Sequence, residues 1–143
     1  MRKRRERQEA IRRIVRAERV RTQRALVERL REQGYVCTQA TVSRDITEMG
    51  LRKLPEGVYV LAEDLHLQRM ISDLVSDVQR SNNLVLIKAA AGTAPGVAAA
   101  LDAAELEDIL GSIAGDDTIL VITTTDESGS RLVETVNKFR GAT

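Results

Sequence analysis

The chain has 143 residues, enough to bury a hydrophobic core in one domain or in two small ones. It carries 22 Lys and Arg against 21 Asp and Glu, and its single cysteine excludes an internal disulfide bond and a zinc site built from cysteines. No run of about 18 apolar residues is present, and the basic N-terminus is followed by polar residues rather than an apolar segment. We therefore expect a cytoplasmic protein with neither a membrane helix nor a secretion signal.

The charge is divided unevenly along the chain. Residues 1–64 contain 16 Lys and Arg and 10 Asp and Glu, whereas residues 65–143 contain 6 Lys and Arg and 11 Asp and Glu. A basic half joined to an acidic half predicts two domains with different partners, a polyanion for the first and a cation for the second. We place the first domain at 1–64, a linker at 65–70 and the second domain at 71–143.

Three helices are predicted in the basic half. Apolar residues at helical spacing, surrounded by arginines, indicate the first helix over residues 5–17. Thr22 is suited to cap a second helix, which ends at Gly34, and Thr38 is suited to cap a third helix over residues 39–49. Cys37, which precedes the third helix, is predicted to be a small, semi-buried filler of the core.

The third helix has one apolar face and one polar face. Val42, Ile46 and Met49 fall together at about 100° per residue and form the predicted core face. The remaining surface is small and polar with one long cation. It suits a DNA groove, because hydroxyl groups reach phosphates or bases and arginine binds guanine with two hydrogen bonds. The candidate DNA-binding residues on this helix are Gln39, Thr41, Ser43 and Arg44.

A basic β-hairpin is predicted after the third helix. Two short β-type runs, 51–54 and 58–61, flank a turn at 55–57 that contains Pro and Gly. Three helices followed by such a hairpin are the order of a winged helix-turn-helix domain. Its third helix enters the major groove, and here Arg52 and Lys53 of the wing would lie along the DNA backbone. The alternative is a three-helix packing module whose arginines form only a solvated face.

The nature of the DNA ligand follows from the aromatic content. The chain has only two Tyr, one Phe and no Trp. Proteins that bind single strands stack the bases on aromatic rings. The composition therefore favours a duplex ligand.

The acidic half alternates helices and strands. Apolar residues from 67 to 78 form one helical stripe, and Ser130 is suited to cap the last helix. Between them we predict, in order, a strand at 84–87, a helix capped by Thr93 that runs to about Ala104, and strands at 109–114 and 118–124. The predicted fold is α+β, a winged helix-turn-helix domain followed by a small α/β domain whose sheet is packed by helices. A domain of about 75 residues is marginally stable alone, so we expect it to oligomerise.

Two adjacent carboxylates, Asp116 and Asp117, lie between the last two predicted strands. Like charges side by side repel, so such a pair is tolerated in an exposed turn or where a cation binds. A simple turn explains most pairs of this kind. The alternative is a site for a guanidinium or ammonium ligand, because a guanidinium presents planar donors that match carboxylates two at a time. Asp102, late on the preceding helix, is a candidate third carboxylate.

No catalytic or metal-binding set is found in the sequence. There is no Ser/His/Asp or Cys/His set, no glycine-rich phosphate loop with a lysine and no metal-ligand spacing, and His66 has no neighbouring ligand. We therefore expect no catalytic residue, no metal and no cofactor. A small enzyme that uses the Asp pair as acid and base is kept as an alternative, as is an architectural DNA binder without a ligand.

Two segments resemble the bacterial arginine repressor family. Residues 111–120, Gly-Ser-Ile-Ala-Gly-Asp-Asp-Thr-Ile-Leu, with residues 92–94 and 101–102 upstream, resemble its effector-binding domain. Residues 39–46, Gln-Ala-Thr-Val-Ser-Arg-Asp-Ile, independently resemble its recognition helix. The likeness covers nearly the whole chain, in the same order.

The resemblance implies a complete regulatory scheme. The N-terminal domain would read palindromic operator half-sites in double-stranded DNA, and the C-terminal domains would form trimers that stack into a hexamer. L-arginine would bind between the trimers as corepressor of its own biosynthetic genes, and some members of the family also activate arginine breakdown. The acids Asp102, Asp116 and Asp117 would hold the ligand, with Ala114 and Gly115 beside them.

One position departs from the family pattern. Members often carry a glutamine or histidine in the turn before the helix of Asp102, where this chain has Pro95. Proline has neither a polar side chain nor a backbone N–H, so one contact to the ligand is expected to be lost or to be made by backbone groups. A winged-helix regulator that responds to a different cationic metabolite is therefore the main alternative.

Overall fold

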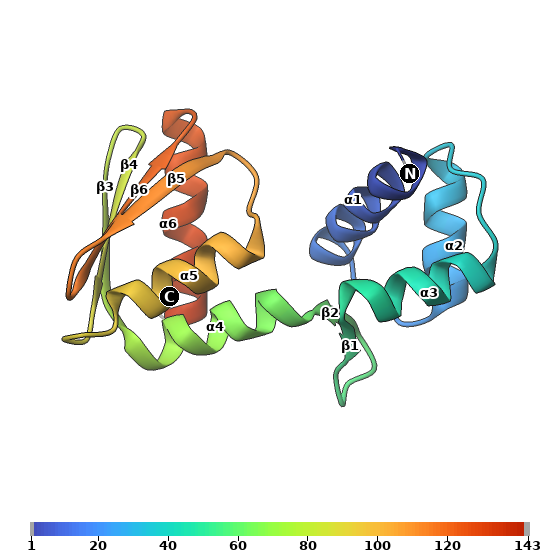
Figure 1. Ribbon diagram of the computed structural model, residues 1–143, viewed down its shortest axis with the longest axis horizontal. Coiled ribbons are helices and arrows are strands. Elements are labelled where there is room, and N and C mark those ends of the chain that lie inside the picture. The colour runs from blue at the N-terminus through green and yellow to red at the C-terminus, as the bar shows by residue number, and fades with distance from the viewer. Residues whose placement is uncertain (1, 142–143) are drawn as a thin grey trace. The chain divides into compact units, whose positions relative to one another are not determined.

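The computed structural model describes residues 2–141, and the chain divides into two units that meet in sequence at Ala62 and Glu63 (Figure 1). The first unit contains three helices and a hairpin, and the second contains a four-stranded sheet with its helices. Among the described residues, none of the helices has both the length and the apolar character needed to cross a membrane.

The N-terminal unit has the predicted three helices followed by a hairpin. Its elements are α1 (Arg2–Ala17), α2 (Gln23–Glu32), α3 (Gln39–Met49), β1 (Leu51–Lys53) and β2 (Tyr59–Leu61). Both predicted N-caps are confirmed. The Thr22 side chain accepts a hydrogen bond from the backbone N–H of Ala25 at 3.0 Å, and Thr38 accepts one from Thr41 at 3.2 Å. Gly50 ends α3 in the left-handed conformation, with a φ of 69°.

One apolar core joins these elements. Its fully buried members come from all three helices and from the hairpin, and include Ile11, Leu26, Leu30, Val42 and Leu61. The predicted core face of α3 is confirmed, because Val42 and Ile46 are buried and Met49 packs at the edge of the same cluster. Burial of each such side chain contributes about 1.5–3 kcal/mol, so the apolar core holds the three helices together.

The hairpin is attached to the rest of this unit at a strand and at its turn. β1 and β2 pair antiparallel, with Lys53 opposite Tyr59. The backbone N–H of Tyr59 donates to the carbonyl of Val20 at 2.9 Å, and the guanidinium of Arg21 donates to the carbonyl of Glu56 in the turn at 3.0 Å. The segment between α1 and α2 therefore fixes the hairpin relative to the helices.

The C-terminal unit is an antiparallel sheet with helices on one face. Its elements are α4 (Ala62–Leu74), β3 (Val75–Ser81), β4 (Leu84–Ala89), α5 (Ala94–Ala104), β5 (Ile109–Ala114), β6 (Thr118–Thr123) and α6 (Asp126–Arg140). The strand order is β3-β4-β6-β5, which places β5 at an edge. Helices α5 and α6 pack against the same face of the sheet, and the α+β fold class is confirmed (Figure 1).

The sheet has one buried face and one open face. On β4 and β6 the buried face carries four side chains that are each at most 1% exposed, Val85, Ile87, Ile119 and Val121. The open face is also apolar, and its half-buried or exposed members are Leu84, Leu86, Ile113, Leu120 and Ile122. On the edge strand, Leu110 and Ile113 are 70% and 69% exposed. An apolar face of this kind is typical of a surface that another protein chain covers.

The structure differs from the prediction where a helix was expected up to residue 78. α4 ends at Leu74, and Val75 begins β3, a strand that the apolar pattern did not indicate. Val75 and Val78 have the spacing of a helix face, yet both are buried, because a β-bulge shifts the register between Val75 and Asp77. The segment 65–70, expected to be a linker, lies inside α4 and is helical.

The predicted N-cap of the last helix is also wrong. Thr125 caps α6: its hydroxyl accepts from the N–H of Ser128 at 3.1 Å, and the Ser128 hydroxyl accepts from the N–H of Thr125 at 2.9 Å. Ser130, the predicted cap, lies inside the helix. Gly129 obscured the start of the helix in the sequence, because glycine disfavours helix interiors. Here a Cβ on Gly129 would lie 2.9 Å from the carbonyl of Asn82, so the packing requires glycine.

Thr125→Ala is expected to lower the free energy of unfolding by about 1 kcal/mol, because it removes the partner of a backbone N–H at the start of α6. Ser130→Ala is the matched control. It removes a hydroxyl from the same helix without removing a cap, so a change within about 0.5 kcal/mol is expected. Urea unfolding followed by far-UV circular dichroism measures both variants. Equal losses in the two would contradict the assignment of Thr125 as the cap.

Candidate functional site

The surface of α3 carries most of the candidate DNA-binding residues. Gln39 and Arg44 are exposed, and Thr41 and Ser43 are half-buried. Within the part of the chain that the structure describes, the guanidinium of Arg44 has no hydrogen-bond or ion-pair partner. A free guanidinium on an exposed helix face is suited to bind phosphates or guanine.

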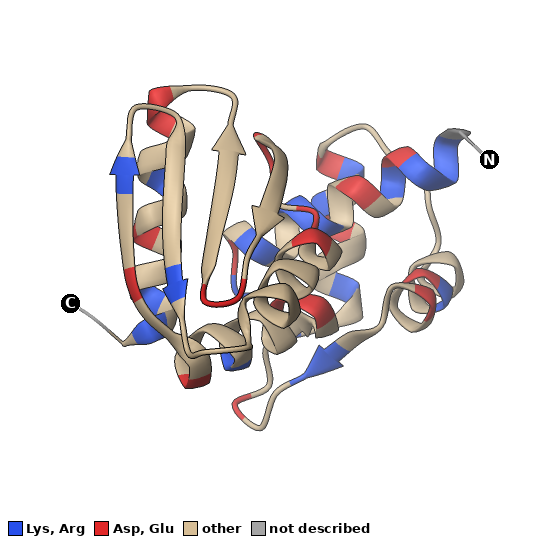
Figure 2. Cartoon of the chain, turned by 60° about the vertical axis from the view of Figure 1, so that its left-hand side comes forward, with Lys and Arg blue, Asp and Glu red and all other residues tan. Residues whose placement is uncertain are grey.

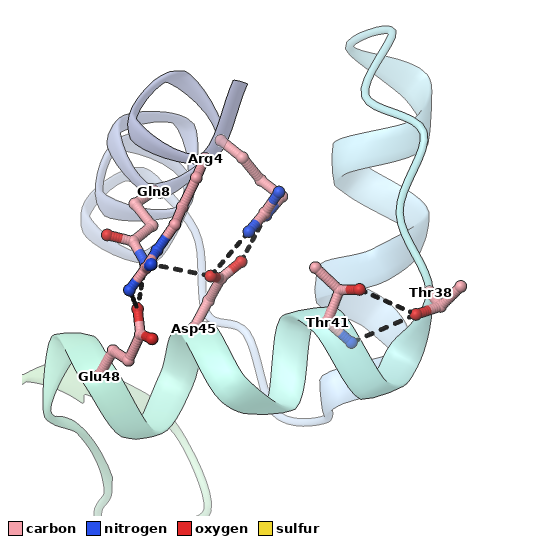
Figure 3. A network of polar contacts seen from close by, with 7 residues as sticks. Arg4, Gln8, Thr38, Thr41, Asp45 and Glu48 are labelled. Carbon is pink, nitrogen blue, oxygen red and sulfur yellow. Dashed lines mark hydrogen bonds and ion pairs between the residues drawn. The ribbon is translucent and has the colours of Figure 1, made fainter. Parts of the chain in front are cut away.

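Two of these residues also form hydrogen bonds within the helix or its cap. The hydroxyl of Thr41 lies 3.0 Å from that of Thr38, and the backbone N–H of Thr41 donates to the same oxygen at 3.2 Å (Figure 3). The carbonyl of Ser43 accepts a hydrogen bond from the hydroxyl of Thr47 at 3.3 Å. Thr41 therefore belongs to the cap of α3, whereas Ser43 contributes only its backbone to this bond.

Two further cations lie on the hairpin. Arg52 and Lys53 are adjacent and exposed on β1, which is drawn blue in Figure 2. The ammonium group of Lys53 lies 5.4 Å from the centroid of the Tyr59 ring, within range of a cation–π interaction. Because Tyr59 is also bonded to the segment between α1 and α2, the hairpin holds Lys53 in a defined position.

A buried carboxylate on α3 was not predicted from the sequence. Asp45 is 2% exposed and accepts two hydrogen bonds from the guanidinium of Arg7, through Nε and, at 2.9 Å, through Nη2. The side-chain amide of Gln8 donates to Asp45 at 3.0 Å and to Glu48 at 2.9 Å, and Arg4 forms an ion pair with Glu48 (Figure 3). The only available signal was that these cations and acids recur at helical spacing on α1 and α3.

These contacts set the ionisation of Asp45. Burial by itself raises the pKa of the carboxyl group, but hydrogen bonds from Arg7 and Gln8 and the charge of Arg7 outweigh it, so the pKa lies below its usual value. The hydrogen bond to Asp45 in turn raises the pKa of Arg7. The carboxylate therefore stabilises the folded domain at any pH above the pKa of the unfolded chain. This contribution is lost as the pH falls through the lower pKa of the folded state.

The adjacent acids Asp116 and Asp117 occupy the turn between β5 and β6, drawn red in Figure 2. The backbone N–H of Gly115 donates to the carbonyl of Thr118 at 2.8 Å, which closes a turn with the two acids at its centre. The carbonyl of Asp116 accepts from the first N–H of α5 at 3.1 Å, and that of Asp117 accepts from the last N–H of β4 at 2.8 Å. The backbone is thus fixed, while both carboxylates are exposed and adjoin the half-buried Ala114.

One of the two carboxylates is oriented by a neighbouring hydroxyl. Thr118 donates to Oδ1 of Asp117 at 2.9 Å and accepts from the ammonium of Lys88 at 2.8 Å. Neither Asp116 nor Asp117 forms an ion pair within the described residues. This chain of hydrogen bonds was not predicted from the sequence, because it depends on the pairing of β4 with β6.

Asp102 lies apart from the acidic turn within one chain. It is exposed near the C-terminal end of α5 and accepts a hydrogen bond from the hydroxyl of Ser112 on β5 at 3.3 Å. The acidic turn contacts the opposite end of the same helix, at Ala94, about 12 Å away along the helix axis. The structure therefore places Asp116 and Asp117 together, but not with Asp102.

Pro95 lies in the first turn of α5, where its missing N–H costs little because these groups have no partner within the helix. Thr93 precedes the helix, but its hydroxyl donates to the carbonyl of Ala90 at 2.6 Å, so its side chain does not form the predicted cap. The carbonyl of Asp116 takes that role by accepting from the N–H of Ala94 at 3.1 Å. The acidic turn and the start of α5 are therefore one hydrogen-bonded unit.

The carboxylate acceptors of the acidic turn suit an organic cation. Among the residues that the structure describes, no three His, Cys, Asp or Glu side chains lie close enough to hold a metal ion. The turn instead offers two exposed carboxylates on a fixed backbone, with oxygens that accept several N–H donors. A guanidinium has the planar set of donors that matches such a pair.

Comparison with known proteins assigns both halves of the chain. The family model described as arginine repressor, DNA binding domain, matches residues 2–67, and that described as arginine repressor, C-terminal domain, matches residues 71–138. The arginine repressor of Thermus thermophilus is 47% identical over 138 residues, which cover 89% of this chain and 84% of the relative. The arginine repressor of Carboxydothermus hydrogenoformans is 41% identical over 144 residues, which cover 93% of this chain and 96% of the relative. That of Deinococcus radiodurans is 40% identical over 143 residues, which cover 92% of this chain and 91% of the relative. The chain belongs to the arginine repressor family of DNA-binding transcriptional regulators.

Proposed function

We propose that this protein represses arginine biosynthesis genes by binding double-stranded operator DNA, with L-arginine as its corepressor. The observation that carries the proposal is the presence, in one chain, of a winged helix-turn-helix with a free Arg44 and a turn with two exposed carboxylates. An arginine-controlled repressor requires a domain that binds a polyanion and a domain that binds a cation. The proposal is of a regulator rather than an enzyme, without a cofactor, acting in the bacterial cytoplasm where the chromosome lies. It extends to activation of arginine catabolism.

In the proposed DNA complex, α3 enters the major groove. Arg44 donates two hydrogen bonds to a guanine or binds a phosphate, and Gln39 and Ser43 contact bases or phosphates beside it. Arg52 and Lys53 of the hairpin lie along the backbone. Because several of these contacts are ionic, the affinity is expected to fall steeply as the salt concentration rises.

In the proposed effector site, the acidic turn binds the guanidinium of L-arginine. The backbone of the turn is fixed and Thr118 bonds to Asp117, so the turn loses little conformational entropy when the ligand binds. Asp102 lies about 12 Å from the turn along α5. We therefore propose a site between subunits, where the turn of one subunit holds the guanidinium and Asp102 of another binds the amino group.

The open face of the sheet supports the proposed hexamer, a dimer of trimers. This face presents apolar side chains from three neighbouring strands, among them the exposed Leu84 and Ile113. An apolar surface on so small a domain gains stability when other copies cover it. We propose that the trimer buries this face and that arginine binds where two trimers meet.

Arg44→Ala is expected to weaken operator binding about 10- to 100-fold, because one good contact to a base contributes about 1–3 kcal/mol to recognition. The fold and the oligomeric state are expected to be unchanged, since Arg44 is exposed. Fluorescence anisotropy with a duplex that the protein selects from a random pool measures the affinity. Arg69→Ala, which removes an exposed arginine outside the N-terminal unit, is the control. Full operator affinity in Arg44→Ala would show that α3 is not the reading element.

Asp117→Asn is expected to weaken L-arginine binding about 10- to 100-fold, because a charge-assisted hydrogen bond to the guanidinium contributes about 1.5–3 kcal/mol. Isothermal titration calorimetry measures the affinity, and sedimentation with and without L-arginine reports the oligomeric state. Asp73→Asn is the matched control, since it removes an exposed carboxylate from α4. If Asp117→Asn binds arginine as tightly as the unchanged protein, the site lies elsewhere.

Pro95 favours one alternative function, a regulator of the same architecture that responds to a different cationic metabolite. Proline offers the ligand no polar side chain and no N–H at a position beside the acidic turn. Calorimetry with lysine, ornithine and citrulline beside arginine separates the two functions. Arginine is expected to bind most tightly, and a tighter complex with another of these ligands would favour the alternative.

A further inference from the structure

One of the carboxylates of α3, that of Asp45, is buried against α1. Asp45, the neighbour of Arg44 in the chain, is 2% exposed, and Glu48 forms an ion pair with Arg4 of α1. Arg44 is exposed to solvent. Because successive helix positions lie about 100° apart, the buried Asp45 and the exposed Arg44 project from α3 in different directions.

The contacts between α1 and these acids are directional. Arg7 donates from Nη2 to Oδ1 of Asp45 at 2.9 Å and from Nε to the other carboxylate oxygen, so two planar groups meet edge to edge. Gln8 donates to both Asp45 and Glu48, which ties successive turns of α3 to one residue of α1. Apolar contacts such as those of Val42 tolerate small rotations, because burial of apolar area has no direction. A rotation of α3 would break the bonds from Arg7 and Gln8.

Separation of Arg7 from Asp45 is energetically unfavourable. The two side chains are 15% and 3% exposed, so neither group regains full hydration if the other moves away. A buried charge without its partner is strongly unfavourable, whereas a paired one selects the arrangement that keeps the pair intact. The pair therefore selects one orientation of α3 among several that would bury a similar apolar area.

We propose that Asp45 and Arg7 are positioning residues for operator recognition, because their two hydrogen bonds set the angle at which α3 presents Arg44 and Ser43 to the base edges. The inference rests on the proposed function of the N-terminal domain as a reader of DNA sequence. Hydrogen bonds to bases require a defined geometry, whereas attraction to phosphates does not. Loss of the pair therefore weakens binding to the operator more than binding to unrelated DNA.

The test compares two substitutions on α3 that change the net charge equally. Asp45→Asn removes the negative charge and replaces one of the two acceptor oxygens with an NH2 donor, so the paired bonds from Arg7 cannot both form. Glu48→Gln removes the negative charge of the exposed partner of Arg4. Full-length protein with L-arginine is titrated with two duplexes. One is selected by the unchanged protein from a random pool, and the other is a scrambled duplex of the same composition. The ratio of the two Kd values measures sequence discrimination.

Asp45→Asn is expected to lower this ratio at least about tenfold through weaker binding of the selected duplex, which is the loss of about one base contact. The scrambled duplex is expected to bind as tightly as before or more tightly, because a negative charge has been removed. Glu48→Gln is expected to change the ratio by less than about threefold, since its pair is exposed. An unchanged ratio in Asp45→Asn would overturn the positioning role. If the unchanged protein selects no duplex, the proposed reading function fails, and this inference fails with it.

If Asp45→Asn does not fold, Arg7→Lys tests the positioning role of the pair instead. Lysine keeps the positive charge opposite Asp45 but lacks the planar pair of donors. Circular dichroism establishes that the variant is folded, and its ratio is expected to fall as for Asp45→Asn. A folded Arg7→Lys protein with the original ratio would show that the pair only neutralises charge, which would also overturn the proposal.

Discussion

Asp45 is buried between α1 and α3, so its carboxylate needs hydrogen-bond donors and an opposite charge from within the N-terminal domain. A carboxylate removed from water loses several kcal/mol of hydration unless donors and an opposite charge replace it. Arg7 and Gln8 supply both, and the pKa of Asp45 falls accordingly. α1 must then pack on α3 in one orientation. The hairpin begins at Leu51, directly after the glycine that ends α3, and its bonds to the segment between α1 and α2 hold it beside the oriented helix.

In the acidic turn of the C-terminal domain, by contrast, the carboxylates are exposed rather than buried. Hydrogen bonds to β4 and α5 fix its backbone, yet Asp116 and Asp117 are exposed and form no ion pair within the described residues. In water the repulsion between neighbouring charges is modest, but it grows when a ligand or another subunit excludes solvent. A cation with several donors then becomes the favourable partner. In the proposed effector site, the turn is thus already ordered and the ligand supplies the matching charge.

What the sequence predicted correctly depends on neighbours in the chain. The caps Thr22 and Thr38 and the turn that holds Asp116 act on residues a few positions away, so residue type is enough to find them. The missed strand β3, the buried pair at Asp45 and the position of Asp102 depend on more distant segments. The β-bulge that allows both Val75 and Val78 to be buried forms only when β3 pairs with β4. Asp45 is an ordinary surface residue until Arg7, 38 residues earlier, packs against it, and the separation of Asp102 from the turn follows from the length of α5.

Assembly and arginine binding are coupled in the proposed hexamer, because the open face and the acidic turn belong to the same strands, β5 and β6. Bringing turns from several subunits together adds repulsion between carboxylates, which opposes the gain from covering the apolar face. A bound guanidinium removes this repulsion. A ligand that binds only the assembled state stabilises it by RT ln(1 + [L]/Kd), about 2.7 kcal/mol per site at a hundred times Kd. By reciprocity, assembly raises the affinity for arginine equally, so the balance between apolar burial and carboxylate repulsion sets the arginine concentration at which the repressor responds.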